Sequence, residues 1–99
     1  MKIVQIVPQA KNKEKLKSLL KRGEIELRGK TTFVRSGEGR WKHVKYKGWI
    51  NWGDAGSGII IAEIKTKNQE SEWQILQAYI GYLNRNMGKY IESISIYFR

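Results

Sequence analysis

The sequence contains no cysteine, one proline and one histidine, and only 9 acidic residues against 19 lysines and arginines. Without cysteine the chain has no disulfide, no thiolate metal site and no cysteine nucleophile, which suits a reducing compartment. A single histidine without cysteine cannot build a typical transition-metal site. We therefore expect no metal, no other cofactor and a cytoplasmic location.

Long hydrophobic runs are missing as well. The apolar stretch near the N-terminus, residues 2–7, is too short and too interrupted for a signal peptide or a membrane span, so we expect no membrane association. A content of 40% hydrophobic and 11% aromatic residues is typical of a folded chain. A length of 99 residues allows one core, which predicts a single domain over residues 1–99.

The positive charge is concentrated in one half of the chain. The formal net charge is +10, with 14 lysines and arginines against 4 acids in residues 1–52 and 5 of each in residues 53–99. A field of this kind attracts polyanions and accelerates encounter with them. The leading hypothesis is therefore a non-enzymatic domain that binds nucleic acid, DNA or RNA, and the plain alternative is a solvated surface.

The pattern of apolar residues predicts an α+β fold with a mainly antiparallel sheet and two helices, packed as a two-layer α/β sandwich. The order is βαβββαβ. A capping box at Ser71 and a stripe of Leu76, Tyr79, Ile80, Leu83 and Met87 define the second helix, which Gly88 ends. The other expected elements are strands at 2–7, 24–35, 40–52, 59–67 and 90–98, and a helix at 13–22 that stops at Gly23.

The candidate binding residues follow from a hairpin closed by residues 36–39. If Arg35 faces Arg40 and Val34 faces Trp41, one face of the hairpin is basic and aromatic together. Such a surface suits phosphates and unpaired bases, although Trp41 and Trp49 can also belong to a core or a dimer interface. The predicted phosphate contacts are Lys13, Lys17 and Lys21, and the predicted platform consists of Lys30, Trp41, His43, Lys45, Lys47 and Trp49.

A second hypothesis concerns acidic residues around residues 54–65. Glu63-Ile64-Lys65, preceded by an apolar run and by Asp54, partly resembles the metal-binding strand of the PD-(D/E)XK nuclease superfamily. The resemblance implies that an Asp and a Glu hold Mg²⁺ and that Lys65 supports the attacking water. The first acid is Asp54, in a turn, or Glu38, at the head of the strand expected over residues 40–52. The implied catalytic set is Glu38, Asp54, Glu63 and Lys65.

A third hypothesis is an assembly role. A small sheet has two exposed edges, and edge strands pair readily with other strands. The alternative to nucleic-acid binding is therefore a homodimeric protein-interaction domain.

Overall fold

The computed structural model describes residues 1–99 and has a six-stranded sheet with two α-helices. The strand order is β2-β3-β4-β5-β1-β6, and every neighbouring pair is antiparallel. The elements are β1 (Lys2–Pro8), α1 (Leu16–Glu26), β2 (Phe33–Gly37), β3 (Arg40–His43), β4 (Trp49–Asp54), β5 (Ile60–Lys65), α2 (Gln69–Met87), a 3₁₀ turn (Gly88–Tyr90) and β6 (Ile91–Phe98).

The predicted α+β class, with an antiparallel sheet and two helices, is confirmed, but the element order contains one more strand than expected. The segment expected to form one strand over residues 40–52 divides into β3 and β4. Gly48 is the reason: it has a φ of 147°, and a Cβ there would lie 2.8 Å from the carbonyl oxygen of Lys65. The chain turns at this glycine because only glycine allows that approach.

The first helix begins at Leu16 and ends at Glu26, both later than predicted. It continues through Gly23 instead of ending there. A Cβ on Gly23 would lie 2.9 Å from both the Met87 methyl group and the Tyr82 hydroxyl oxygen. This glycine therefore permits close contact between α1 and α2 and is not a stop signal. The strand predicted from residue 24 begins only at Phe33, after a turn.

The second helix matches its predicted apolar stripe but has a different N-cap. Asn68 caps it, with its side-chain oxygen accepting a hydrogen bond from the Ser71 amide at 2.7 Å. The predicted capping box at Ser71 is thus wrong, because the helix begins about one turn earlier. Neither helix has the length and apolar content that a membrane span requires.

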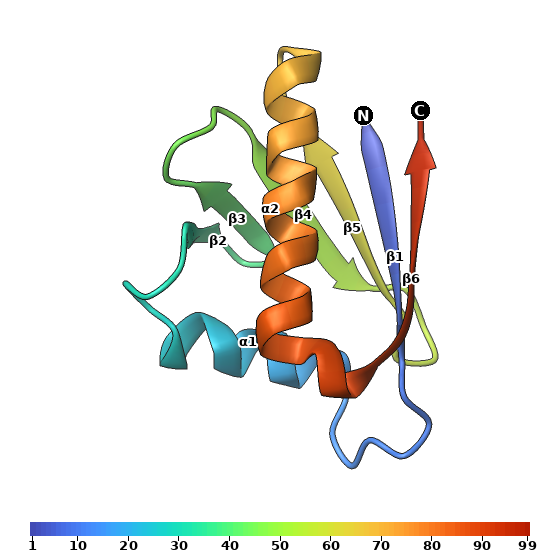
Figure 1. Ribbon diagram of the computed structural model, residues 1–99. Coiled ribbons are helices and arrows are strands. Elements are labelled where there is room, and N and C mark those ends of the chain that lie inside the picture. The colour runs from blue at the N-terminus through green and yellow to red at the C-terminus, as the bar shows by residue number, and fades with distance from the viewer.

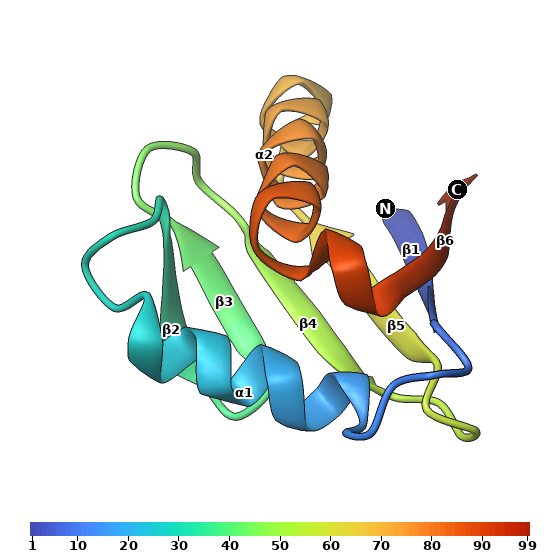
Figure 2. The ribbon, with the colours of Figure 1, turned by 60° about the horizontal axis from the view of Figure 1, so that its bottom comes forward.

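One hydrophobic core lies between the sheet and the helices, which cover the same face of the sheet (Figures 1 and 2). Along β5 the buried side chains alternate with half-exposed ones, as expected when only one face is covered. Burial of each large side chain stabilises the fold by about 1.5–3 kcal/mol. The opposite face of the sheet carries no helix, and we call it the open face.

Candidate nucleic-acid interface

The register of the β2–β3 hairpin differs by one residue from the prediction. Arg35 lies opposite Trp41 and Phe33 opposite His43, with an irregularity between Arg35 and Gly37. An extra residue in one strand of a pair forms a bulge, and a shift of one residue places each side chain opposite a different partner. Val34 consequently faces Lys42 instead of Trp41.

This shift removes Trp41 from the predicted platform. Its side chain is only 2% exposed and packs in the core, with ring centroids 5.1 Å from Tyr82 and 6.0 Å from Phe33. The indole Nε1 donates a hydrogen bond to Glu24 Oε1 at 2.5 Å. Trp41 is therefore a core residue, and no base can stack on it.

His43 lies on the same side of β3 as Trp41 and shapes the following turn. Its ring packs edge-on against Phe33 at 5.1 Å, and its Nδ1 accepts hydrogen bonds from the amides of Lys45 and Tyr46. Partial burial, reinforced by the charge of Lys45, lowers the pKa of His43. The ring is thus neutral at physiological pH and contributes no positive charge to the surface.

The open face contains a different basic and aromatic arrangement. Trp49 lies directly between Lys42 of β3 and Lys65 of β5 in the sheet register. The guanidinium carbon of Arg40 lies 5.5 Å from the centroid of the Trp49 ring, within cation–π range. Trp49 is half-buried, and its Nε1 is buried without a hydrogen-bond partner. We call Arg40, Lys42, Trp49 and Lys65 the tryptophan row.

Further cations lie at the same end of the sheet. Lys45 and Lys47 are in the β3–β4 loop, and Lys67 follows β5 (Figure 1). The close contact of Gly48 with Lys65 and Thr66 fixes the loop beside the end of β5. Within this group only Lys65 has a carboxylate partner, Glu63, at 3.9 Å. The remaining cations have no carboxylate partner and can bind an anion.

The lysines predicted to contact phosphate do not join this group. Lys13 precedes α1, Lys17 lies on its exposed side, and Lys21 forms an ion pair with Glu38 at 3.7 Å. Lys30 is exposed in the turn that follows α1. In both views α1 crosses the end of the sheet opposite to the β3–β4 loop (Figures 1 and 2). The lysines predicted to contact phosphate therefore lie at the opposite end of the sheet from Lys45 and Lys47 of the predicted platform.

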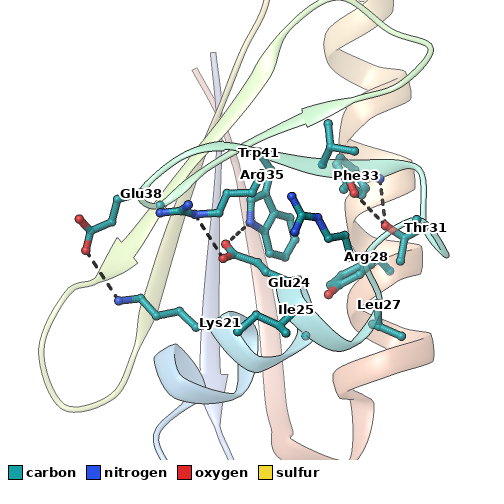
Figure 3. Close-up of a pocket in the computed structure, with 15 residues that line it drawn as sticks. Lys21, Glu24, Ile25, Leu27, Arg28, Thr31, Phe33, Arg35, Glu38 and Trp41 are labelled. Atoms are coloured by element: carbon teal, nitrogen blue, oxygen red, sulfur yellow. Dashed lines mark hydrogen bonds and ion pairs between the residues drawn. The ribbon is translucent and has the colours of Figure 1, made fainter.

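A cleft of about 540 Å³ separates α1 from the β2–β3 hairpin, and we call it the α1–β2 cleft (Figure 3). Its cations are Lys21, Arg28 and Arg35, and its aromatic lining is Phe33, Trp41 and Tyr82. Glu38 pairs with Lys21, and Glu24 lies 3.6 Å from the Arg35 Nε while it also binds Trp41.

The carboxylates make the cleft a poor phosphate site. The Glu24 side chain is largely buried, and its contacts hold it where a phosphate would otherwise approach Arg35. Burial, followed by the charge of Glu24, raises the pKa of Tyr82 to about 12, so this hydroxyl stays neutral. The cleft has a volume typical of small-ligand pockets, but of its three cations only Arg28 has no carboxylate partner.

The acidic residues implied by the nuclease resemblance are not brought together. Asp54 ends β4 opposite Ile60, and its Oδ1 accepts a hydrogen bond from the Gly56 amide at 2.7 Å. Glu63 lies opposite Asn51 on the open face, whereas Asp54 alternates onto the helix side. Glu38 is in the β2–β3 turn, and no group of three or more acidic, histidine or cysteine side chains is placed to hold a metal. Lys65 belongs instead to the tryptophan row.

Comparisons of the chain with models of known protein families, with curated proteins and with solved structures give no match. Function must therefore be inferred from the geometry of the chain itself. The strongest feature is the tryptophan row, because it combines a half-buried indole with two cations, Arg40 and Lys42, that have no carboxylate partner; the Arg40 Nε donates a hydrogen bond to Asn51 Oδ1 at 3.0 Å.

Proposed function

We propose that this chain binds single-stranded nucleic acid on the open face of its sheet and does so without catalysing a reaction. The observation that carries the proposal is the tryptophan row: Trp49 stands between Lys42 and Lys65 in the register, with Arg40 against its ring. The net charge of +10 supports it, because a field of that sign draws a polyanion to the surface.

The chemistry of the row suits an unpaired strand. Neighbouring strands lie about 4.8 Å apart, so the two lysines flank the indole closely enough to contact phosphates beside a stacked base. Stacking of a base on an aromatic side chain contributes about 1–3 kcal/mol, and lysines add affinity through counterion release. Bases in a duplex are already stacked, which favours a single strand as the ligand.

The test compares two tryptophans that both reach the surface. Trp49→Ala removes the ring of the row, whereas Trp73→Ala removes a 46% exposed tryptophan on α2. We expect Trp49→Ala to weaken binding of a fluorescein-labelled single-stranded oligonucleotide by about ten- to a hundredfold. Trp73→Ala and Trp49→Phe should stay close to the unmodified chain. Equal losses from the two alanine variants would remove the row from the binding site.

A further inference from the structure

The edge strand β6 is an unprotected pairing surface. It pairs with β1 alone, and its outer edge has no strand beside it. Half of the backbone groups of an edge strand point outward without a hydrogen-bond partner in the sheet. A strand of eight residues therefore offers a long template for another strand.

The side chains of β6 are unusually apolar for an exposed edge. Ile96, Tyr97 and Phe98 are 37%, 45% and 68% exposed, although they follow one another in the chain. Ile94, Ile96 and Phe98 lie on the helix side of β6. On that side α2 covers the central strands and does not cover β6 (Figure 1). The Lys2 ammonium lies 5.3 Å from the centroid of the Phe98 ring.

The opposite edge of the sheet is protected by comparison. The strand β2 has five residues, carries Arg35 and contains the irregularity before Gly37. Short length, charge and bulges are the features that keep edge strands from pairing. In β6 the one charged residue, Glu92, and the irregularity in the pairing with β1 lie at the start of the strand, and residues 93–98 contain no charge, no proline and no glycine.

We infer that the chain forms a homodimer in which β6 pairs antiparallel with β6 of a second copy, giving one continuous sheet. The pairing is isologous, so the strand must complement itself. With Ser95 opposite its own counterpart, Ile94 faces Ile96 of the other copy, because paired residues lie on the same side. The isoleucines then form one apolar strip on the helix side, and on the other side Ser93 faces Tyr97 of the other copy, with Ser95 between them.

The charge distribution favours a second copy at this edge. Residues 53–99 have equal numbers of acids and cations, whereas the excess positive charge is in residues 1–52. The strands β2 and β3, which carry Arg35, Arg40 and Lys42, lie at the far side of the sheet from β6 (Figure 1). In a molecule that measures 38 × 30 × 22 Å, β6 pairing keeps the two basic regions apart. Their separation exceeds the screening length of about 10 Å in moderate salt.

Sedimentation equilibrium over a concentration series tests the dimer independently of nucleic acid. We expect the unmodified chain to dimerise, and Ile96→Lys to raise the dimer Kd by about tenfold or more, because it places like charges across the two-fold axis. The matched control is Val34→Lys, the same change at a 45% exposed residue of the other edge strand. It should leave the dimer Kd unchanged.

Hydrogen exchange of the unmodified chain supplies a measurement that needs no variant. Outward-pointing β6 amides should gain protection as the concentration rises, whereas the edge amides of β2 should not. A chain that stays monomeric at all concentrations would overturn the dimer. Equal effects of Ile96→Lys and Val34→Lys would also overturn it.

Discussion

The tryptophan row and the α1–β2 cleft both combine aromatic rings with cations, yet they differ in what the cations and rings already contact. In the cleft, Lys21 and Arg35 face Glu38 and Glu24, and Trp41 is sealed in the core. In the row, Arg40 and Lys42 have no carboxylate partner, and Trp49 is half-buried on the open face. Charge and aromatic content alone therefore do not locate a polyanion site, because internal pairing decides which cations remain available.

The largest expected effect is the difference in unfolding free energy between variants of Trp41 and Trp49. Trp41→Ala should lower the free energy of unfolding by about 3–5 kcal/mol, because it empties a fully packed core position. Trp49→Ala should lower it by no more than about 2 kcal/mol, since that ring is partly exposed. Urea unfolding of both variants provides the measurement. A larger loss for Trp49→Ala would reverse the roles assigned to these residues.

The next effect compares a buried ion pair with an exposed one. Glu72 accepts a hydrogen bond from the Lys2 ammonium at 2.6 Å, whereas Glu63 and Lys65 are both well exposed. Glu72→Gln should cost about 1.5–3 kcal/mol of unfolding free energy. Glu63→Gln should cost less than about 1 kcal/mol. Comparable costs, measured by urea unfolding, would contradict the difference in environment.

Acid pH tests the same pair without a mutation. Burial alone would raise the pKa of Glu72, but the Lys2 hydrogen bond and the α-amino group outweigh it, and the net pKa lies below 4.5. Because the folded pKa is depressed, the contribution of Glu72 to stability is complete above pH 4.5 and is lost as the pH falls through the folded pKa. Thermal unfolding of the unmodified chain should show this loss, and Glu72→Gln should lack that component.

A smaller effect probes the carboxylates of the cleft. Glu38→Gln releases Lys21 from its ion pair and should raise the affinity for a single-stranded oligonucleotide by less than about fivefold. Glu92→Gln on β6 changes the net charge equally and serves as the control. A gain from Glu38→Gln well above that from Glu92→Gln, in fluorescence anisotropy, would indicate that the cleft contributes to binding after all.

The smallest expected effect belongs to His43. Its folded pKa is depressed below 6.5, so its contribution to stability is present above pH 6.5 and is lost as the pH falls through the folded value. His43→Asn keeps an acceptor for the amides of Lys45 and Tyr46 but does not titrate. A stability profile of this variant that still falls across the same interval would assign the loss to another group.

The sequence predicted the class of fold and the elements that have a clear pattern of apolar residues. The stripe of α2 and the apolar run of β5 depend on local pattern, and both elements form where expected. The errors arise from long-range packing. Gly23 reads as a helix stop but serves the contact with Tyr82 and Met87, and Gly48 breaks a strand because it meets Lys65.

The candidate site was only partly predictable for the same reason. A bulge near Ser36 shifts the hairpin by one residue, and that shift alone decides the cross-strand partner of every residue in β2. From the sequence, Trp49 was predicted as a nucleic-acid-binding residue, but Arg40 and Lys42 were not. Alternation within Trp49–Asp54, where Ile50 and Trp52 are buried, is the signal that could have placed Trp49 on the open face. The pairing of Trp49 with Lys65 depends on tertiary structure and has no local signature.

The most direct test of the tryptophan row is the salt dependence of oligonucleotide binding for two double variants with the same net charge. Lys42→Gln with Lys65→Gln removes the lysines of the row, and Lys13→Gln with Lys17→Gln removes two near α1. For a single strand, loss of two phosphate contacts lowers the slope of log K against log salt by about 1.4. We predict this decrease for the first double variant and a clearly smaller one for the second. Equal slopes for the two would show that net charge, and not the row, binds the strand.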